Sequence, residues 1–170
     1  MHAAEPAAEK IETPPVPAQV ATIDHDLATA RKAPSAKDAI TTDIGVVREF
    51  VAWFDAGGAL RKASYVQDGA LRHESYFGGD AGKERAIFAI ERGKSVSEKQ
   101  PGDFEIRSWF REDGTLSAAT YQRAGETEPV KPGTPLFAAE ADLAALQTQV
   151  TLLLTETLRL PAKAPAASAK

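Results

Sequence analysis

The most informative absence in this 170-residue chain is that of cysteine. Without cysteine there is no disulfide framework, no thiolate metal site and no cysteine nucleophile. Long apolar runs are also missing, and because a membrane-spanning helix needs about 20 consecutive apolar residues, no transmembrane segment is expected. The chain has no excess of basic charge either, since 24 acidic residues outweigh 20 basic ones. Nucleic-acid binding depends on neutralising phosphates, and we therefore expect no nucleic-acid partner.

Bulky apolar side chains are scarce and unevenly distributed. Hydrophobic residues make up 43% of the chain, but 32 residues are alanine. Residues 1–40 and 161–170 hold half of these alanines and seven of the eleven prolines. Such segments bury too little apolar surface to offset the entropy lost on ordering. We therefore predict a disordered leader over residues 1–40, with a short helix possible between Ile23 and Lys32, a single domain over residues 41–160 and a disordered tail over residues 161–170.

The composition of the predicted leader also indicates where in the cell the protein is located. Its first residues form neither a basic nor an apolar signal-peptide region, so no signal peptide is expected in this chain. The Ala/Pro-rich composition resembles the mature end of an exported bacterial protein, in which such a segment spaces a domain from a membrane or wall. This favours a periplasmic or secreted protein, with a cytoplasmic protein as the alternative.

An internal repeat dominates the central domain. Residues 58–65 and 69–76 are identical at six of eight positions, and residues 53–69 share seven matching positions with residues 109–125. An eleven-residue offset fits a strand of about seven residues followed by a tight turn. The Asp-Gly pairs at 68–69 and 113–114 provide residues that such turns favour. The repeat therefore predicts an antiparallel meander.

The predicted fold class is α+β, with a meander sheet of about six strands and one long C-terminal amphipathic helix packed on one face. The predicted strands cover residues 46–54, 59–67, 70–77, 84–91, 103–110 and 116–123. The helix is expected over residues 137–160, with a start signal at Thr134 and Pro135 and a stop at Pro161. Its apolar positions have three-and-four spacing and are expected to face the sheet: Leu143, Leu146, Val150, Leu153 and Leu160.

Alternation along the strands predicts that one sheet face, rich in phenylalanine and leucine, seats the helix. The opposite face is expected to collect every tryptophan and tyrosine together with arginine, a composition favoured in binding hot spots. These are the candidate binding residues: Trp53, Tyr65, Tyr76, Trp109, Tyr121, Arg61 and Arg72. Cross-strand aromatic pairs and arginine stems also stabilise exposed sheets without any ligand, and a curved sheet would instead line a cavity with these residues. Substitution of Tyr65 and Tyr76 by alanine separates these hypotheses.

No pattern in the chain predicts catalysis, a cofactor or a metal site. The three histidines, His2, His25 and His73, form no zinc-ligand pattern, and no serine-hydrolase or phosphate-loop motif occurs. Asp24 and Asp26 flank His25, but they are interpreted as acids at a helix start. Glu74 and Glu105 are expected on one face, yet they belong to no known carboxylate motif. We therefore predict a protein that is not an enzyme.

The units at residues 53–65 and 109–121 resemble the bacterial MORN-like repeat, with an aromatic pair, a glycine turn, a leucine and a closing tyrosine. The resemblance extends over about residues 50–125. It implies a β-meander used as an interaction surface, as in antitoxin or immunity proteins, and implies no catalytic residues. The chain lacks the Tyr-x-Gly opening of eukaryotic MORN repeats, so membrane or phosphoinositide binding is not implied.

Three functional hypotheses follow from the sequence. The first is a non-enzymatic module of the bacterial envelope that binds a protein or a glycan through the aromatic and arginine face. The second is a carrier of a small apolar ligand, held in a cavity between the curved sheet and the helix. The third is a hydrolase inhibitor that inserts the segment between Gly93 and Asp103 into an active site. The sequence predicts no particular oligomeric state.

Overall fold

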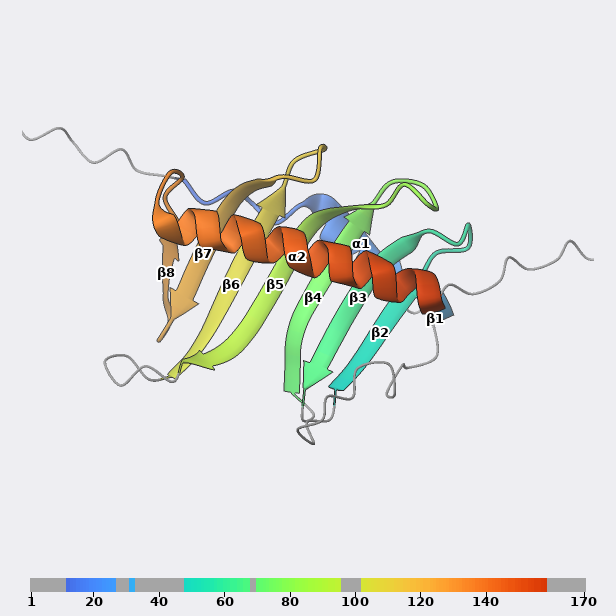
Figure 1. The fold of residues 1–170 in the computed structure, drawn as a ribbon, viewed down its shortest axis with the longest axis horizontal. Helices are drawn as coiled ribbons and strands as arrows, with labels where there is room; N and C mark the ends of the chain where they lie inside the picture. Colours follow the sequence, from blue (N-terminus) through green and yellow to red (C-terminus); the bar gives the residue numbers. More distant parts are fainter. Residues whose placement is uncertain (1–11, 27–30, 33–47, 68–69, 96–101, 159–170) are drawn as a thin grey trace, which may run out of the picture.

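The computed structural model describes residues 12–26, 31–32, 48–67, 70–95 and 102–158, and its centre is a single antiparallel sheet (Figure 1). The eight strands follow one another in sequence order, so the predicted meander is confirmed. The strands are β1 (Arg31–Lys32), β2 (Arg48–Phe54), β3 (Leu60–Gln67), β4 (Ala70–Gly78), β5 (Arg85–Ser95), β6 (Gly102–Phe110), β7 (Leu116–Arg123) and β8 (Glu126–Pro129). The predicted strands correspond to β2 to β7, while the short strands β1 and β8 extend the sheet at its two edges.

The sequence repeat is also a structural repeat. Gly58 and Gly114 both have φ of 82°, a left-handed conformation that glycine adopts without strain. In both turns the glycine N–H donates to a carbonyl three residues earlier, at 3.0 and 2.9 Å. The register shifts between Trp53 and Phe54, and again between Trp109 and Phe110, so each unit contains a bulge at its aromatic pair. The two units therefore build the same hairpin twice.

Helix α2 (Pro135–Leu158) crosses one face of the sheet, which we call the α2 face (Figure 1). The hydroxyl of Thr134 accepts a hydrogen bond from the N–H of Phe137 at 3.2 Å, as expected for a residue that caps a helix start. Proline is well suited to the first helical position, because it has no N–H to satisfy. The predicted start of the helix is thus confirmed, and the predicted residues after Leu158 lie outside the described part of the chain.

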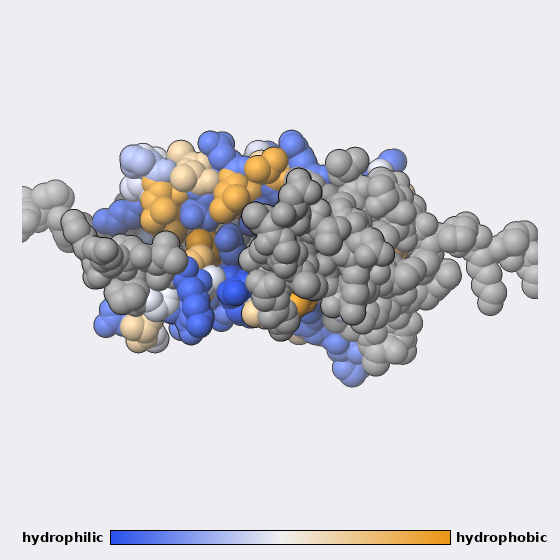
Figure 2. All heavy atoms as spheres, turned by 60° about the horizontal axis from the view of Figure 1, so that its bottom comes forward, coloured by the Kyte–Doolittle hydropathy of each residue, from blue (hydrophilic) through white to orange (hydrophobic). Residues whose placement is uncertain are grey.

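The predicted orientation of α2 is wrong at Leu143 and Leu146. They are 37% and 58% exposed, whereas Ala144 and Thr151 are each 6% exposed and face the sheet. The side chains of Val150, Leu153 and Leu160 lie outside the described part of the structure. Figure 2 shows apolar residues gathered at the surface in the upper left of the view. The sheet below already carries large phenylalanine side chains, so small helix residues allow the closest approach of the two layers. Spacing alone identified an apolar stripe but not the layer that the stripe faces.

The main core lies between α2 and the sheet. Its fully buried side chains come from β2, β3 and β4, and the largest of them are Phe54, Leu60 and Phe77. A second cluster joins Leu116 of β7 to Ala144 of α2. Helix α2 therefore connects the two ends of the meander across one continuous apolar layer.

Helix α1 (Ala18–Asp26) lies on the opposite face, which we call the α1 face (Figure 1). Val20 is 6% exposed and packs with Tyr76, Phe88 and Trp109 of the sheet. This corrects the predicted leader for residues 12–26, because the sheet supplies the apolar surface that this segment lacks by itself. Residues 1–11, 27–30 and 33–40 of the predicted leader, and the whole predicted tail over residues 161–170, lie outside the described residues. Neither helix within the described part of the chain is long and apolar enough to cross a membrane.

Candidate interaction site

The register divides the predicted aromatic face between the two sides of the sheet. Three of its residues share the α1 face: Trp53, Tyr76 and Trp109. Tyr65 pairs instead with Phe50, and Tyr121 pairs with Ile106, so both tyrosines lie on the α2 face. The prediction of one shared face is wrong for these two residues. Opposite each Trp-Phe pair, the following strand contains one extra residue, which forms a bulge. A strict alternation of side chains, counted from the tryptophan to the tyrosine, therefore predicts the wrong face for the tyrosine.

The aromatic residues at the centre of the α1 face are buried. Tyr76, Phe88 and Trp109 are 3%, 1% and 5% exposed, and Phe88 contacts Trp109 edge to face with ring centroids 5.3 Å apart. The indole N–H of Trp109 donates to the carbonyl of Pro15 at 3.0 Å. Tyr76 donates to the carboxylate of Asp24 at 3.1 Å. Tyr76 and Trp109 are therefore core residues beneath the segment that contains α1, and they offer no open binding surface in this structure.

Two further predicted residues are held by local contacts. Arg61 donates to the carboxylate of Asp55 at 2.7 Å and to the carbonyl of Gly79 at 2.8 Å. It is the extra residue of the bulge opposite Trp53 and Phe54. Trp53 is half-buried, and the ammonium of Lys62 lies 6.0 Å from the centre of its ring. These contacts tie Arg61 to the turns at one end of the sheet.

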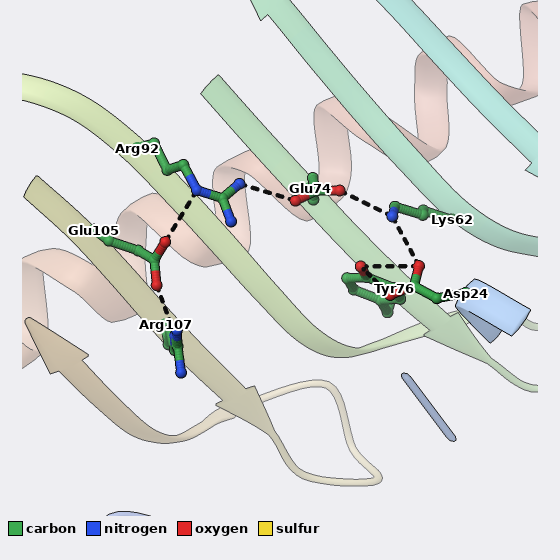
Figure 3. Close-up of polar contacts among 7 residues, drawn as sticks. All are labelled: Asp24, Lys62, Glu74, Tyr76, Arg92, Glu105 and Arg107. Carbon is green, nitrogen blue, oxygen red and sulfur yellow. Dashed lines mark hydrogen bonds and ion pairs between the residues drawn. The ribbon is translucent and has the colours of Figure 1, made fainter. Parts of the chain in front are cut away.

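A chain of alternating charges crosses the α1 face (Figure 3). Lys62 bridges Asp24 and Glu74, with N–O distances of 2.9 Å to each. Glu74 continues to Arg92 at 2.9 Å, which reaches Glu105 at 3.0 Å. Arg107 ends the chain at 2.7 Å from Glu105. We call these six residues the charge ladder: Asp24, Lys62, Glu74, Arg92, Glu105 and Arg107.

The ladder keeps its buried members charged. Burial by itself would lower the pKa of Lys62, but hydrogen bonds with Tyr76, Glu74 and Asp24 outweigh it and raise that pKa above its ordinary value. Burial would raise the pKa of Glu74, but hydrogen bonds from Lys62 and Arg92 lower it below its ordinary value. The Lys62 and Glu74 side chains are only 10% and 13% exposed, so each depends on the other for its charge.

Strands β4 and β5 separate at the end of the sheet that lies away from the turns contacted by Arg61. The two strands pair from Gly78 and Arg85 as far as His73 and Glu91, and beyond that point the described residues of β5 pair with β6 alone. Two hollows of about 440 and 360 Å³ adjoin there. The residues that line both hollows are Arg72, Arg92, Gly93 and Phe104. We call this combined site the β4–β5 cleft.

The aromatic wall of the cleft depends on a glycine. A Cβ at Gly93 would lie 2.5 Å from the ring of its cross-strand partner Phe104, so only glycine leaves room for the ring there. Phe104 in turn stacks on Tyr121, with ring centroids 6.0 Å apart and planes at 19°. Tyr65 lines the hollow of about 360 Å³ together with Gln147 of α2. Tyr65 and Arg72 are thus the predicted binding residues that the structure brings together at the cleft.

Arg72 is an open cation of the cleft, together with the exposed Lys94. Arg72 is half-buried and makes no hydrogen bond or ion pair with any described residue. Arg92, by contrast, is shared between Glu74 and Glu105. A guanidinium donates through five N–H groups and binds carboxylates in a two-pronged geometry. The cleft therefore combines an available anion-binding group with aromatic surfaces.

Sequence reasoning missed Gly93, Phe104 and Arg92 as members of a site. The predicted strand ends at residue 91, before Gly93, whereas β5 continues to Ser95. A glycine inside a strand commonly marks a close approach of another group, and this was the available signal. The opposed position of Phe104 depends on the register between β5 and β6, which the sequence does not contain.

His73, the buried histidine of β4, is not arranged for catalysis. Its Nε2 lies 2.6 Å from the hydroxyl of Ser75, but Ser75 is only 2% exposed and is closed to a substrate. Burial lowers the pKa of His73 to about 4, and its Nδ1 has no hydrogen-bond partner. In the described ranges, no three histidine or acidic side chains are grouped closely enough to hold a metal ion. The neutral histidine is a polar member of the α2 face.

Comparisons with known proteins give little further information. No family model matches the chain, and no curated protein matches it. A solved structure with some likeness is the crystal structure of the pneumococcal O-GlcNAc transferase GtfA in complex with UDP and GlcNAc. The identity is 14% and the TM-score 0.30, and the match covers 75% of this chain and 25% of that one. A likeness at this level supports no functional statement, and the MORN-like resemblance stays a prediction.

Proposed function

We propose that the protein is a non-enzymatic interaction module of the bacterial envelope that binds a protein or glycan partner through the β4–β5 cleft. The observation that carries this proposal is the half-buried Arg72, which has no partner among the described residues. Holding an arginine partly out of water without a counter-charge is unfavourable. A bound anion would supply the missing partner.

The chemistry of the cleft favours a carboxylate that is attached to a flat or apolar group. Arg72 would bind the carboxylate, and Tyr65 and Phe104 would contact the attached group. Aromatic and arginine side chains together give affinity at interfaces, because aromatic rings bury a large area with few rotatable bonds and the planar guanidinium donates several hydrogen bonds. Acidic side chains of a protein and uronic acids of a glycan both satisfy this description.

The test compares the wild-type chain with Arg72→Ala on arrays of acidic peptides and of uronic-acid glycans. Arg85→Ala is the matched control, because Arg85 is an exposed arginine at the other end of β5, 3.9 Å from Glu112. Loss of a charge-assisted hydrogen bond predicts an affinity at least about tenfold lower for Arg72→Ala. The control is expected to bind like the wild type. Binding of carboxylate ligands that is equal in all three proteins would refute the role of the cleft.

The carrier hypothesis makes a different prediction. Native mass spectrometry of the purified chain would then show a retained small molecule, and Arg72→Ala would leave it in place. A module that binds an external partner is expected to give the mass of the bare chain.

A further inference from the structure

Helix α2 has a second apolar side that faces away from the sheet. Leu136, Leu143 and Leu146 are 53%, 37% and 58% exposed, and they are the large exposed hydrophobic residues of the described part of this helix. The described side chains of this helix that lie against the sheet include the buried Ala144 and Thr151. Three large apolar side chains left this exposed on one helix form a patch of the kind that marks an interaction surface.

The spacing of these leucines is that of a coiled coil. Intervals of seven and three residues separate Leu136, Leu143 and Leu146, which places them at the a and d positions of a heptad. In the sequence Val150 and Leu153 continue the same spacing. A helix of this length extends over roughly 36 Å. The exposed leucines form a narrow apolar ridge over the first half of the helix, and another helix with the same spacing fits such a ridge best.

The residues beside the ridge permit a second copy of the same helix. The described neighbours are mostly small or uncharged, as Ala139, Ala145 and Gln149 are. No lysine or arginine occurs between Pro135 and Leu158, and the acidic residues beside the ridge are Glu140 and Asp142, so a second copy has to pack in a register that keeps these charges apart. In a parallel pair the heptad sets Asp142 opposite Gln147 of the other copy, which avoids like charges.

We infer that the leucine ridge of α2 is a homodimer interface, in which the α2 helices of two copies pack along each other. The same patch then serves both subunits, as two-fold symmetry requires. The ridge is one helix wide, so the buried area falls at the low end for specific interfaces, below about 1,200 Å² in total. We therefore expect a dimer that dissociates on dilution. This inference does not rest on the function proposed for the β4–β5 cleft, although Gln147 of α2 lines that cleft as well.

Sedimentation of the full chain over a range of concentrations tests the interface. The wild type is expected to pass from monomer to dimer, and Leu143→Asp/Leu146→Asp is expected to raise the dissociation constant by about 100-fold. Val16→Asp is the matched control, because Val16 is 44% exposed outside α2. Circular dichroism checks that each variant is folded. A wild type that stays monomeric at every concentration, or a dimer that survives the double substitution, would overturn the inference.

Crosslinking gives a second test that does not depend on weakened association. The chain has no cysteine, so Leu146→Cys introduces one thiol without competitors. Leu146 lies near the middle of α2, and it is close to its own counterpart in either a parallel or an antiparallel pair. Oxidation is expected to give a covalent dimer with Leu146→Cys but none with Val16→Cys. Leu136→Cys reports the orientation, since it crosslinks only if the pair is parallel. Equal crosslinking of Leu146→Cys and Val16→Cys would contradict a specific interface.

Discussion

The two faces of the sheet are built from the same strands but are covered in different ways. On the α2 face, a 24-residue helix lies over fully buried phenylalanine and leucine side chains. On the α1 face, a nine-residue helix covers a smaller aromatic cluster, and the charge ladder occupies the rest. Apolar burial thus stabilises the first face, and the second combines a thin apolar cover with ion pairs.

Two consecutive residues of β4 show what this difference means. His73 points to the α2 face, where burial keeps it neutral and lowers its pKa to about 4. Glu74 points to the α1 face, where Lys62 and Arg92 keep it charged. A buried titratable group is tolerated in its neutral form if it lacks a counter-charge, and in its charged form if it has one. The covering layer therefore decides the chemistry of each position.

The largest expected effect on the free energy of unfolding comes from removing a buried phenylalanine, and one phenylalanine from each face can be compared. Phe77 is fully buried on the α2 face, and Phe88 is 1% exposed on the α1 face. Phe77→Ala is expected to lower the free energy of unfolding by about 4 kcal/mol, measured by urea denaturation. Phe88→Ala is expected to cost less, because the short α1 segment is able to move into the space. An equal or larger loss for Phe88→Ala would mean that α1 is held as firmly as α2.

Breaking the charge ladder is expected to have an effect about half as large as the loss of Phe77. Lys62→Met leaves Glu74 and Asp24 without their shared cation, and we expect a loss of about 2 kcal/mol in the free energy of unfolding. The double variant Lys62→Met/Glu74→Gln removes both buried charges and is expected to regain part of that loss. If the single variant is as stable as the wild type in urea denaturation, the ladder contributes nothing to the α1 face.

The pH dependence of stability separates the two faces. Because the pKa of His73 in the folded chain is about 4, below its ordinary 6.5, the unfolded chain takes up the proton first as the pH falls. The contribution of His73 is complete above pH 6.5 and is lost between pH 6.5 and about 4, by about 2–3 kcal/mol. The pKa of Glu74 is lowered from 4.5, so its contribution is lost only at more acidic pH.

Urea midpoints measured from neutral to acidic pH check this assignment. His73→Gln is expected to remove the dependence of the urea midpoint on pH in the less acidic part of this range. Glu74→Gln is expected to remove it in the more acidic part. A profile in which His73→Gln retains the full loss between pH 6.5 and 4 would show that another group titrates there.

The smallest expected effect concerns the attachment of the N-terminal segment. Trp109→Phe keeps an aromatic ring but removes the hydrogen bond to the carbonyl of Pro15, so we expect a loss of about 1 kcal/mol. Amide hydrogen exchange is expected to become faster in residues 15–24 and to stay unchanged in β2 and β3. Faster exchange throughout the sheet would indicate that Trp109 supports the whole core instead.

Much of the fold was predictable because its signals are local. The turn glycines, the repeated aromatic pairs and the capping Thr134 each act within a few residues, and the strands from β2 to β7 match their predicted positions closely. The candidate site was less predictable. Tyr65 and Arg72 were named from composition, but Gly93 and Phe104 meet only through cross-strand pairing. The parting of β4 and β5, which makes the cleft, has no separate sequence signal.

By itself, then, the sequence determined the order of the elements, their turns and the presence of an apolar stripe on the C-terminal helix. The tertiary structure decided which way that stripe faces at Leu143 and Leu146, which tyrosine shares a face with the tryptophans and that Arg72 has no partner among the described residues. The physical reason is that turns and caps depend on neighbours in the chain, whereas each bulge reverses the alternation of side chains and each covering helix selects among the available faces. These choices depend on packing between residues far apart in the sequence.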